Sequence, residues 1–162
     1  MIPSDAKDGA VSVRPATLAD AEHLVEFNRA MAWETEQKRL DPAVLGRGVG
    51  RVLAEPARGR YWVAESATGV QGGLLVTYEW SDWRDGDWWW IQSVYVRPEA
   101  RGQGVFSALY RHVERLAREA PQVVGLRLYV ERDNRRAQDV YAALGMEDAR
   151  YVVFEDPFQT AR

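Results

Sequence analysis

Residues 93–116 read SVYVRPEARGQGVFSALYRHVERL, and this stretch decides the fold. It opens with an apolar run that predicts a β-strand and passes through a turn to Gly102 and Gly104. Residues 103–119 then carry apolar side chains at helical spacing and predict an amphipathic helix. A strand that leads through glycines into a helix suits an anion, because glycine lets backbone N–H groups approach a ligand and the helix N-terminus carries about half a positive charge.

Length and composition narrow the class of protein. The chain has 162 residues, no cysteine, two histidines and a formal net charge of −3. We expect a flexible tail over residues 1–10 and a single domain over residues 11–162. The negative charge disfavours nucleic acid and anionic membranes as partners, and the lack of cysteine excludes disulfides, thiol nucleophiles and cysteine-type zinc sites. Since neither a signal-peptide pattern nor a long apolar run occurs, we expect a soluble cytoplasmic protein without a metal site.

Periodicity and turn residues on both sides of this stretch predict the other elements. We expect strands at residues 11–14, 61–65, 72–78, 88–96, 123–130 and 151–154, and helices at residues 18–33, 41–53, 103–119 and 135–144. The order β-α-α-β-β-β-α-β-α-β predicts an α/β (α+β) fold, with a single mixed sheet and helices on both of its faces. Three glycines should leave the second helix short, broken or mobile, and the polar residues 79–87 should form a loop.

The glycine loop at residues 101–106 has two interpretations that the loop alone supports equally. It could hold a pyrophosphate, or it could be a plain turn that needs glycine for its backbone angles. A P-loop is excluded because no Gly-Lys-Ser/Thr follows. A dinucleotide fingerprint fits poorly, because Phe106 and Ser107 stand where a third glycine should open the helix.

The segment at residues 130–146, VERDNRRAQDVYAALGM, carries a second pattern. Asn134 is placed to cap a helix and Gly145 to end it. Asn134, Ala137 and Tyr141 recur at helical spacing and would lie along one side of that helix. On spacing alone, Tyr141 is more simply explained as an ordinary core residue.

Taken together, VYVRPEARGQGVFSALY and LYVERDNRRAQDVYAALGM resemble the GNAT superfamily of acetyl-CoA-dependent N-acyltransferases. The first segment is similar to the family's phosphate-binding motif, Gln/Arg-x-x-Gly-x-Gly/Ala. The second is similar to its strand, Asn-capped helix and Tyr-x-x-x-Gly-Phe/Met ending. The predicted order of elements agrees as well, so the resemblance covers about residues 11–155. A finer resemblance, to diamine and other small-amine acetyltransferases, rests on fewer features.

The resemblance implies a role for each motif. The strand at residues 94–96 would pair by its backbone with the pantetheine arm of acetyl-CoA, and the glycine loop would hold the pyrophosphate. Tyr141 would be the general acid that protonates the leaving thiolate, a nearly balanced transfer between a thiol of pKa about 8.5 and a tyrosine of pKa about 10. The implied cofactor-binding residues are Val94, Tyr95, Val96, Arg101, Gly102, Gln103, Gly104, Val105, Phe106, Asn134 and Ala137.

Two residues depart from the family pattern. Phe106 stands where the family usually has glycine or alanine, so we expect an intact phosphate site of altered shape. Gln92 stands where small-amine acetyltransferases often place a glutamate as general base, and a glutamine cannot accept a proton. It could contact the substrate or simply hydrogen-bond within the sheet. An alkylamine of pKa about 10.4 is roughly 0.05% neutral at pH 7, a handicap of roughly 4.5 kcal/mol. We therefore expect a water-relayed base ending on Glu34, Glu36 or Glu79, or an acceptor of low pKa such as an α-amine.

The tryptophans and acidic residues point to the acceptor. Strand alternation places Trp88, Trp90, Gln92 and Val94 on one face, opposite Trp89 and Ile91. Aromatic rings among carboxylates suit a cationic amine, although any single tryptophan more often fills a core or a dimer interface. The predicted acceptor-site residues are Trp33, Glu34, Glu79, Trp90 and Gln92.

The sequence therefore predicts an N-acetyltransferase that uses acetyl-CoA and a primary amine, which attacks directly in a ternary complex. A small-molecule amine is the expected partner, and the Trp-rich middle of the chain is compatible with a homodimer. Two alternatives stay open. One is acetylation of a protein amine. The other is a non-catalytic acyl-CoA-binding module, which Gln92 favours and the presence of both Asn134 and Tyr141 disfavours.

Overall fold

The structure, a computed structural model, describes residues 10–158, so nearly all of the predicted tail lies outside the described residues. The chain divides into two compact units, one ending at Tyr129 and the other beginning at Val130. That residues 11–162 form one domain stays a prediction.

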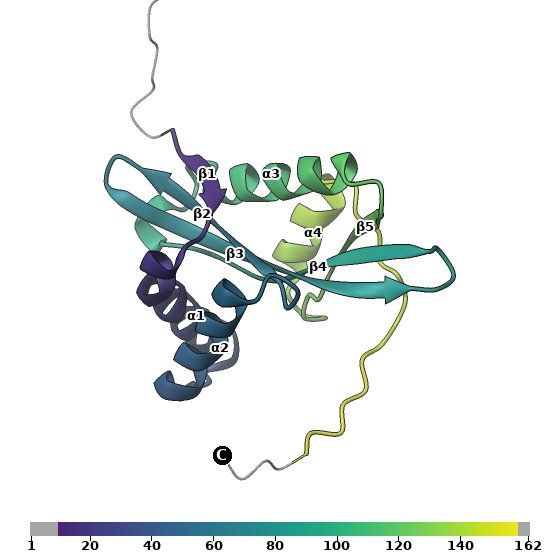
Figure 1. The fold of residues 1–162 in the computed structure, drawn as a ribbon, viewed down its shortest axis with the longest axis horizontal. Coiled ribbons are helices and arrows are strands. Elements are labelled where there is room, and N and C mark those ends of the chain that lie inside the picture. The colour runs from purple at the N-terminus through teal and green to yellow at the C-terminus, as the bar shows by residue number, and fades with distance from the viewer. Residues whose placement is uncertain (1–9, 159–162) are drawn as a thin grey trace, which may run out of the picture. The chain divides into compact units, whose positions relative to one another are not determined.

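The first unit is built on a five-stranded mixed sheet with the strand order β1-β2-β3-β4-β5 (Figure 1). Its strands are β1 (Ser12–Pro15), β2 (Arg60–Ser66), β3 (Gly69–Ser81), β4 (Gly86–Val96) and β5 (Val123–Leu128). Neighbouring strands run antiparallel, except that β4 and β5 run parallel. The mixed sheet confirms the predicted fold class.

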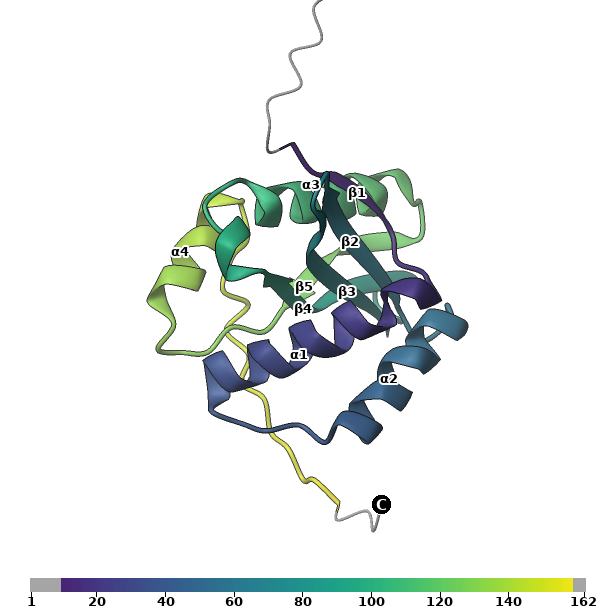
Figure 2. The ribbon, with the colours of Figure 1, turned by 90° about the vertical axis from the view of Figure 1, so that its left-hand side faces the viewer.

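Helices cover both faces of this sheet, as predicted (Figures 1 and 2). One face carries α1 (Ala21–Glu36) and α2 (Pro42–Ala54), and the other carries α3 (Val105–Glu119). Short 3-10 turns, η1 (Leu18–Asp20) and η2 (Pro98–Ala100), precede α1 and α3. The core residues that α3 contributes, Val105, Leu109 and Val113, follow the predicted apolar stripe. Among the described residues, no helix is long and apolar enough to cross a membrane.

Helix α2 is continuous, so the expectation of a short or broken helix is wrong. The Asp41 carboxylate accepts hydrogen bonds from the backbone N–H groups of Ala43 and Val44, at 2.8 and 3.1 Å, which caps the helix start. Val49 is buried against α1 and the sheet, and this packing offsets the low helix propensity of the glycines.

The β3–β4 hairpin is longer than predicted. Strand β3 runs to Ser81 and β4 starts at Gly86, with Glu79 paired to Trp88 and Trp80 paired to Asp87. The predicted loop at residues 79–87 is therefore mostly strand, and only residues 82–85 form a turn. Residues 79–87 are polar because this end of the β3–β4 ladder extends beyond the part of the sheet that the helices cover (Figure 1). Their polarity does not mean that the strands end there.

A β-bulge interrupts the pairing of β4 with β3 at Gln92. Leu75 pairs with Ser93 and the next residue, Val76, pairs with Ile91, so Gln92 has no partner across the ladder. An extra residue in one strand shifts the in-and-out alternation of everything beyond it.

The bulge places Gln92 and Val94 on opposite faces, so the prediction that they share a face is wrong. Leu75 packs against the core between the sheet and helices α1 and α2. Thr77 lies two residues along the same strand and faces the same side. The Gln92 Nε2 group donates to Thr77 Oγ1 at 2.8 Å, which places Gln92 there too. Val94 instead pairs with Leu74 on the α3 face.

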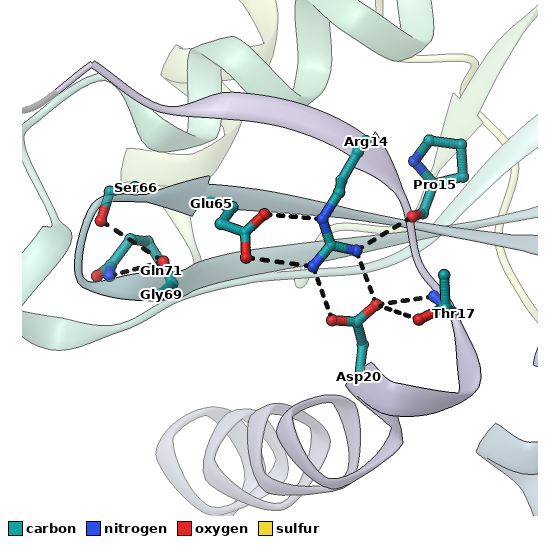
Figure 3. Close-up of polar contacts among 8 residues, drawn as sticks. All are labelled: Arg14, Pro15, Thr17, Asp20, Glu65, Ser66, Gly69 and Gln71. Carbon is teal, nitrogen blue, oxygen red and sulfur yellow. Dashed lines mark hydrogen bonds and ion pairs between the residues drawn. The ribbon is translucent and has the colours of Figure 1, made fainter.

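An ion network ties β1 and β2 to the start of α1 (Figure 3). The Arg14 guanidinium donates to both oxygens of Asp20, at 2.9 and 3.0 Å, and its Nε donates to Glu65 at 2.8 Å. The Thr17 backbone N–H also donates to Asp20, at 2.7 Å. Asp20 is only 4% exposed, and the bonds from Arg14 lower its pKa to about 2.

The second unit contains one helix, α4 (Arg135–Ala143). Asn134 Oδ1 accepts from the Ala137 N–H at 3.1 Å, and Gly145 follows the helix end with φ of 88°, so the predicted cap and ending are confirmed. Described residues 147–158 contain no helix or strand, and the predicted strand at 151–154 is wrong for this structure. The apolar pattern is present, but a strand also needs a neighbour to take its backbone hydrogen bonds, and the described residues of this unit, 130–158, contain no other strand.

Candidate active site

The glycine loop between η2 and α3 has a backbone that only glycine adopts readily. Gly102 and Gly104 have φ of 75° and 82°, and a Cβ added at either would meet no atom within 4 Å. Both therefore lie on an open surface. Gly104 is the N-cap of α3 and brings no side chain to the first N–H groups of that helix. The Gln103 side chain braces the loop by donating to the Glu99 carbonyl at 2.8 Å.

Strand β4 presents an open edge just before this loop. The parallel ladder between β4 and β5 starts at Asp87 and ends at Ile91, whereas β4 itself continues to Val96. Among the described strands, none pairs with this last part of β4 on the side away from β3. The backbone groups that point to that side can receive an extended ligand.

The start of α3 orders the residues that follow the loop. Val105 is buried beneath the helix, where it faces the sheet at Gly72. The ring of Phe106 stacks on Tyr110 one turn further along, with 6.2 Å between the ring centroids. The bulky side chain at the last motif position thus packs along the helix.

Arg101, the first residue of the loop, is held against β4 and α1. Its Nη2 donates to Glu34 Oε2 at 2.8 Å, and its Nε donates to the Val96 carbonyl at 3.0 Å. The guanidinium also lies over the ring of Tyr95, whose hydroxyl donates to the other oxygen of Glu34 at 3.0 Å. Burial, and next the bond to Glu34, raise the pKa of Tyr95.

Three of the predicted acceptor residues meet on the face that carries α1 and α2. Trp90 Nε1 donates to Glu79 Oε2 at 2.5 Å, and Gln92 lies beside them on Thr77, which pairs with Trp90. Arg127 Nη1 donates to the same oxygen of Glu79 at 2.8 Å. The bond from Trp90 and then the bond from Arg127 lower the pKa of Glu79.

The other two predicted acceptor residues, Trp33 and Glu34, lie together near the end of α1. Glu34 is bound by Arg101 and Tyr95, whereas Trp33 lies beneath the guanidinium of Arg39 at 5.3 Å. Among the described residues, neither has a ring contact or hydrogen bond with Glu79, Trp90 or Gln92. The predicted acceptor set therefore falls into two clusters.

Arg127 is the member of the site that the sequence did not reveal. It lies on β5 directly opposite Trp90 and belongs to the same cluster as Glu79. One signal was available, since an arginine inside an otherwise apolar strand has to reach a polar partner. That partner could not be identified from the sequence, because Glu79 is separated from Arg127 by 48 residues.

In the second unit, Tyr141 lies on α4 two residues before the helix ends. Burial raises the pKa of its hydroxyl, so the group stays protonated throughout the neutral range. Asn134 uses its side-chain oxygen to cap the same helix. A protonated hydroxyl of this kind can act as a proton donor.

Comparison with known families gives one match that covers most of the chain. Residues 18–146 match the sequence model described as the acetyltransferase (GNAT) family. Thialysine N-epsilon-acetyltransferase from Bos taurus is 38% identical over 79 residues, which is 49% of this chain and 45% of that protein. Mycothiol acetyltransferase from Mycolicibacterium smegmatis is 32% identical over 155 residues, covering 86% of this chain and 49% of that protein. The chain thus spans less than half the length of these curated relatives.

Solved structures share the same fold. A possible acetyltransferase from Clostridium difficile 630 is 37% identical and superposes with a TM-score of 0.87, covering 93% of this chain and 99% of that one. The ribosomal-protein-alanine N-acetyltransferase from Brucella melitensis biovar Abortus 2308 superposes with a TM-score of 0.72 at 19% identity, covering 93% of this chain and 100% of that chain, and shows the fold alone.

Proposed function

The chain belongs to the acetyltransferase (GNAT) family, and from this premise we propose that it transfers an acetyl group from acetyl-CoA to the primary amine of a small molecule. The amine would attack directly in a ternary complex. The observation that carries the proposal is the open edge of β4, which runs straight into the glycine loop at the start of α3.

The donor end of the site fits a long ligand with a pyrophosphate. The backbone of Val94, Tyr95 and Val96 would pair with the pantetheine arm, and the loop at residues 101–106 would hold the phosphates. The two glycines with positive φ leave open space in front of the loop, and the N-cap of α3 has no side chain. An anion can therefore come close to the first N–H groups of the helix. Acetyl-CoA supplies the activated acyl group as a thioester. A backbone N–H of the same strand segment would polarise its carbonyl.

Tyr141 is proposed as the general acid, with Asn134 and Ala137 beside the cofactor on the same helix. The support is the family motif together with the raised pKa of the Tyr141 hydroxyl. A hydroxyl that keeps its proton at neutral pH can deliver it to a leaving thiolate.

Glu34, and not Glu36 or Glu79, is proposed as the end of the base relay, because a hydrogen-bonded hydroxyl leads to it. Gln92 cannot accept a proton and uses its amide on Thr77. Glu79 is a weaker base than an ordinary glutamate, since Trp90 and Arg127 lower its pKa. Glu34 is joined to the hydroxyl of Tyr95, so a proton could pass along this hydrogen bond to the carboxylate.

The acceptor is proposed to bind on the face that carries α1 and α2, against Glu79, Trp90 and Gln92 on one side and Trp33 and Glu34 on the other. The curated relatives are named for small molecules, thialysine and mycothiol, which supports a small-molecule acceptor. The match covers less than half of either relative, so their acceptors are guides to chemistry only.

The test combines binding and turnover. Calorimetry with CoA and acetyl-CoA measures donor binding, and release of free CoA thiol over an amine panel measures transfer. Since the chain has no cysteine, a thiol reagent reports only the released CoA. Donor binding with thiol release on at least one amine is the expected result. Donor binding with no release on any small or peptide amine would instead favour the non-catalytic binding module, and no donor binding would overturn both.

A further inference from the structure

The proposed acceptor site is less acidic than the sequence predicts, because each of its two predicted carboxylates forms an ion pair with an arginine. Glu79 is paired with Arg127 at 2.8 Å and Glu34 with Arg101 at 2.8 Å. The third polar member, Gln92, is neutral. A diamine acceptor would therefore meet two neutralised carboxylates and a glutamine, which offers little to a second ammonium group.

Arg127 is held in place by an aromatic platform. Its guanidinium carbon lies 4.1 Å from the ring centroid of Trp88, and that ring covers Gly125, where an added Cβ would overlap it. The glycine thus lets the indole lie flat on β5 beneath the arginine. Arg84 lies over the same ring at 5.3 Å and adds a second positive charge. Of the two guanidinium groups over Trp88, that of Arg127 is the nearer to the ring and the one bonded to Glu79.

The geometry leaves Arg127 able to take a further ligand. Its hydrogen bond to Glu79 uses only Nη1, and a guanidinium presents five N–H donors on three nitrogens in a planar fork. Its side chain keeps 30% of its exposure, so the fork is reachable from solvent. Glu79 accepts both of its hydrogen bonds on Oε2, so its pair with Arg127 is not bidentate. Other N–H groups of the guanidinium therefore stay available for a ligand.

We propose that Arg127 binds a carboxylate of the acceptor, and that the acceptor is therefore an amino acid or another short amino-carboxylate, not a diamine. This inference rests on the proposed acetyl transfer and names its substrate class.

The test compares acceptors that differ only in the carboxylate. Lysine is paired with cadaverine, and alanine with ethylamine, in the thiol-release assay with saturating acetyl-CoA. We expect at least one carboxylate-bearing member to show a kcat/KM roughly tenfold or more above that of its partner, the range of one charge-assisted hydrogen bond. Equal or better turnover of both partners that lack the carboxylate would overturn the inference while leaving the acetyl transfer intact.

Variants then assign the effect to Arg127. R127Q should raise KM for the carboxylate-bearing acceptor roughly 10- to 100-fold, with little change in kcat, and should leave KM for its partner within about twofold. R84Q removes a neighbouring charge over the same ring and is the matched control, with a change in KM below about threefold. R127K, which keeps the charge but loses the fork, should fall between wild type and R127Q.

Several results would count against this assignment. They are an equal effect of R127Q on both members of a pair, or an effect of R84Q as large as that of R127Q. Thermal melts and CoA binding of each variant show whether it folds, and R127K serves where R127Q does not. Failure of the proposed function looks different, since wild-type protein would then release no thiol with any acceptor.

Discussion

The guanidinium of Arg101 donates to the carboxylate of Glu34 at 2.8 Å, so the first residue of the glycine loop is paired with the end of α1. The two side chains are 46% and 41% exposed, which makes this an exchangeable ion pair. A phosphate bound in the loop would compete with Glu34 for the same cation.

This competition predicts opposite effects for the two partners. E34Q should tighten CoA binding roughly two- to fivefold, because Arg101 is no longer held by a carboxylate. R101Q should weaken it roughly tenfold. Calorimetry with CoA measures both, and E36Q, which removes the same charge two residues away, should have a smaller effect than E34Q. A weaker affinity in E34Q than in wild type would contradict the competition.

Replacement of Tyr141 by phenylalanine should lower kcat roughly 100-fold without changing CoA affinity, because it removes only the proton donor. Y151F, at an exposed tyrosine of the same unit, is the control. The raised pKa also fixes the pH dependence, since the acid form persists as pH rises and activity that depends on it should fall only above about pH 10. Steady-state rates across pH measure both, and a wild-type kcat in Y141F would remove the proposed role.

Two glycine-to-alanine changes should shift stability in opposite directions. Gly104 has a φ of 82°, where an alanine is strained, so G104A should lower the free energy of unfolding by about 1 kcal/mol. Gly48 lies within α2 with open space around it, so G48A should raise that free energy by up to about 1 kcal/mol. Urea denaturation measures both. The same sign for the two variants would show that backbone conformation does not dominate at these positions.

The Arg14–Asp20 pair predicts a stability loss in acid. The folded-state pKa of Asp20 is lowered to about 2 from an ordinary value of 3.8, so its contribution is complete above pH 4 and is lost as pH falls towards 2. Because Arg14 stays charged throughout this range, only the carboxyl titrates. We expect wild type to lose about 1–2 kcal/mol more than D20N across this window. Denaturation at several pH values measures this, and parallel curves for the two proteins would rule the pair out as the cause.

The fold and the donor end could be predicted because their signals are local. The glycine loop, the Asn134 cap and the apolar stripe of α3 each depend on residues within one or two turns of each other. The α2 helix was misjudged because three glycines outweighed the Asp41 cap in the sequence pattern, whereas packing against α1 decides its length.

The acceptor end could not be predicted to the same depth, because it depends on strand register. Pairing across β3, β4 and β5 brings Glu79 to Trp90 and Arg127. The register between strands cannot be read from any single segment of the sequence. The bulge at Gln92 could not be predicted for the same reason. The sequence pattern of the strand is the same whether or not one of its residues lacks a partner on β3.

That bulge also has a consequence for how the length of the chain can vary among related sequences. Deleting Gln92 would remove the bulge and leave Ile91 and Ser93 opposite Val76 and Leu75, whereas deleting one of the paired residues Ser93 to Val96 would exchange what faces α1 with what faces α3 on one side of the deletion. The turn at residues 82–85 lies beyond the ladder, and there a change of length would only reshape the hairpin tip. Changes of length should therefore accumulate at the tip of the hairpin and, within its second strand, be confined to the bulge at Gln92.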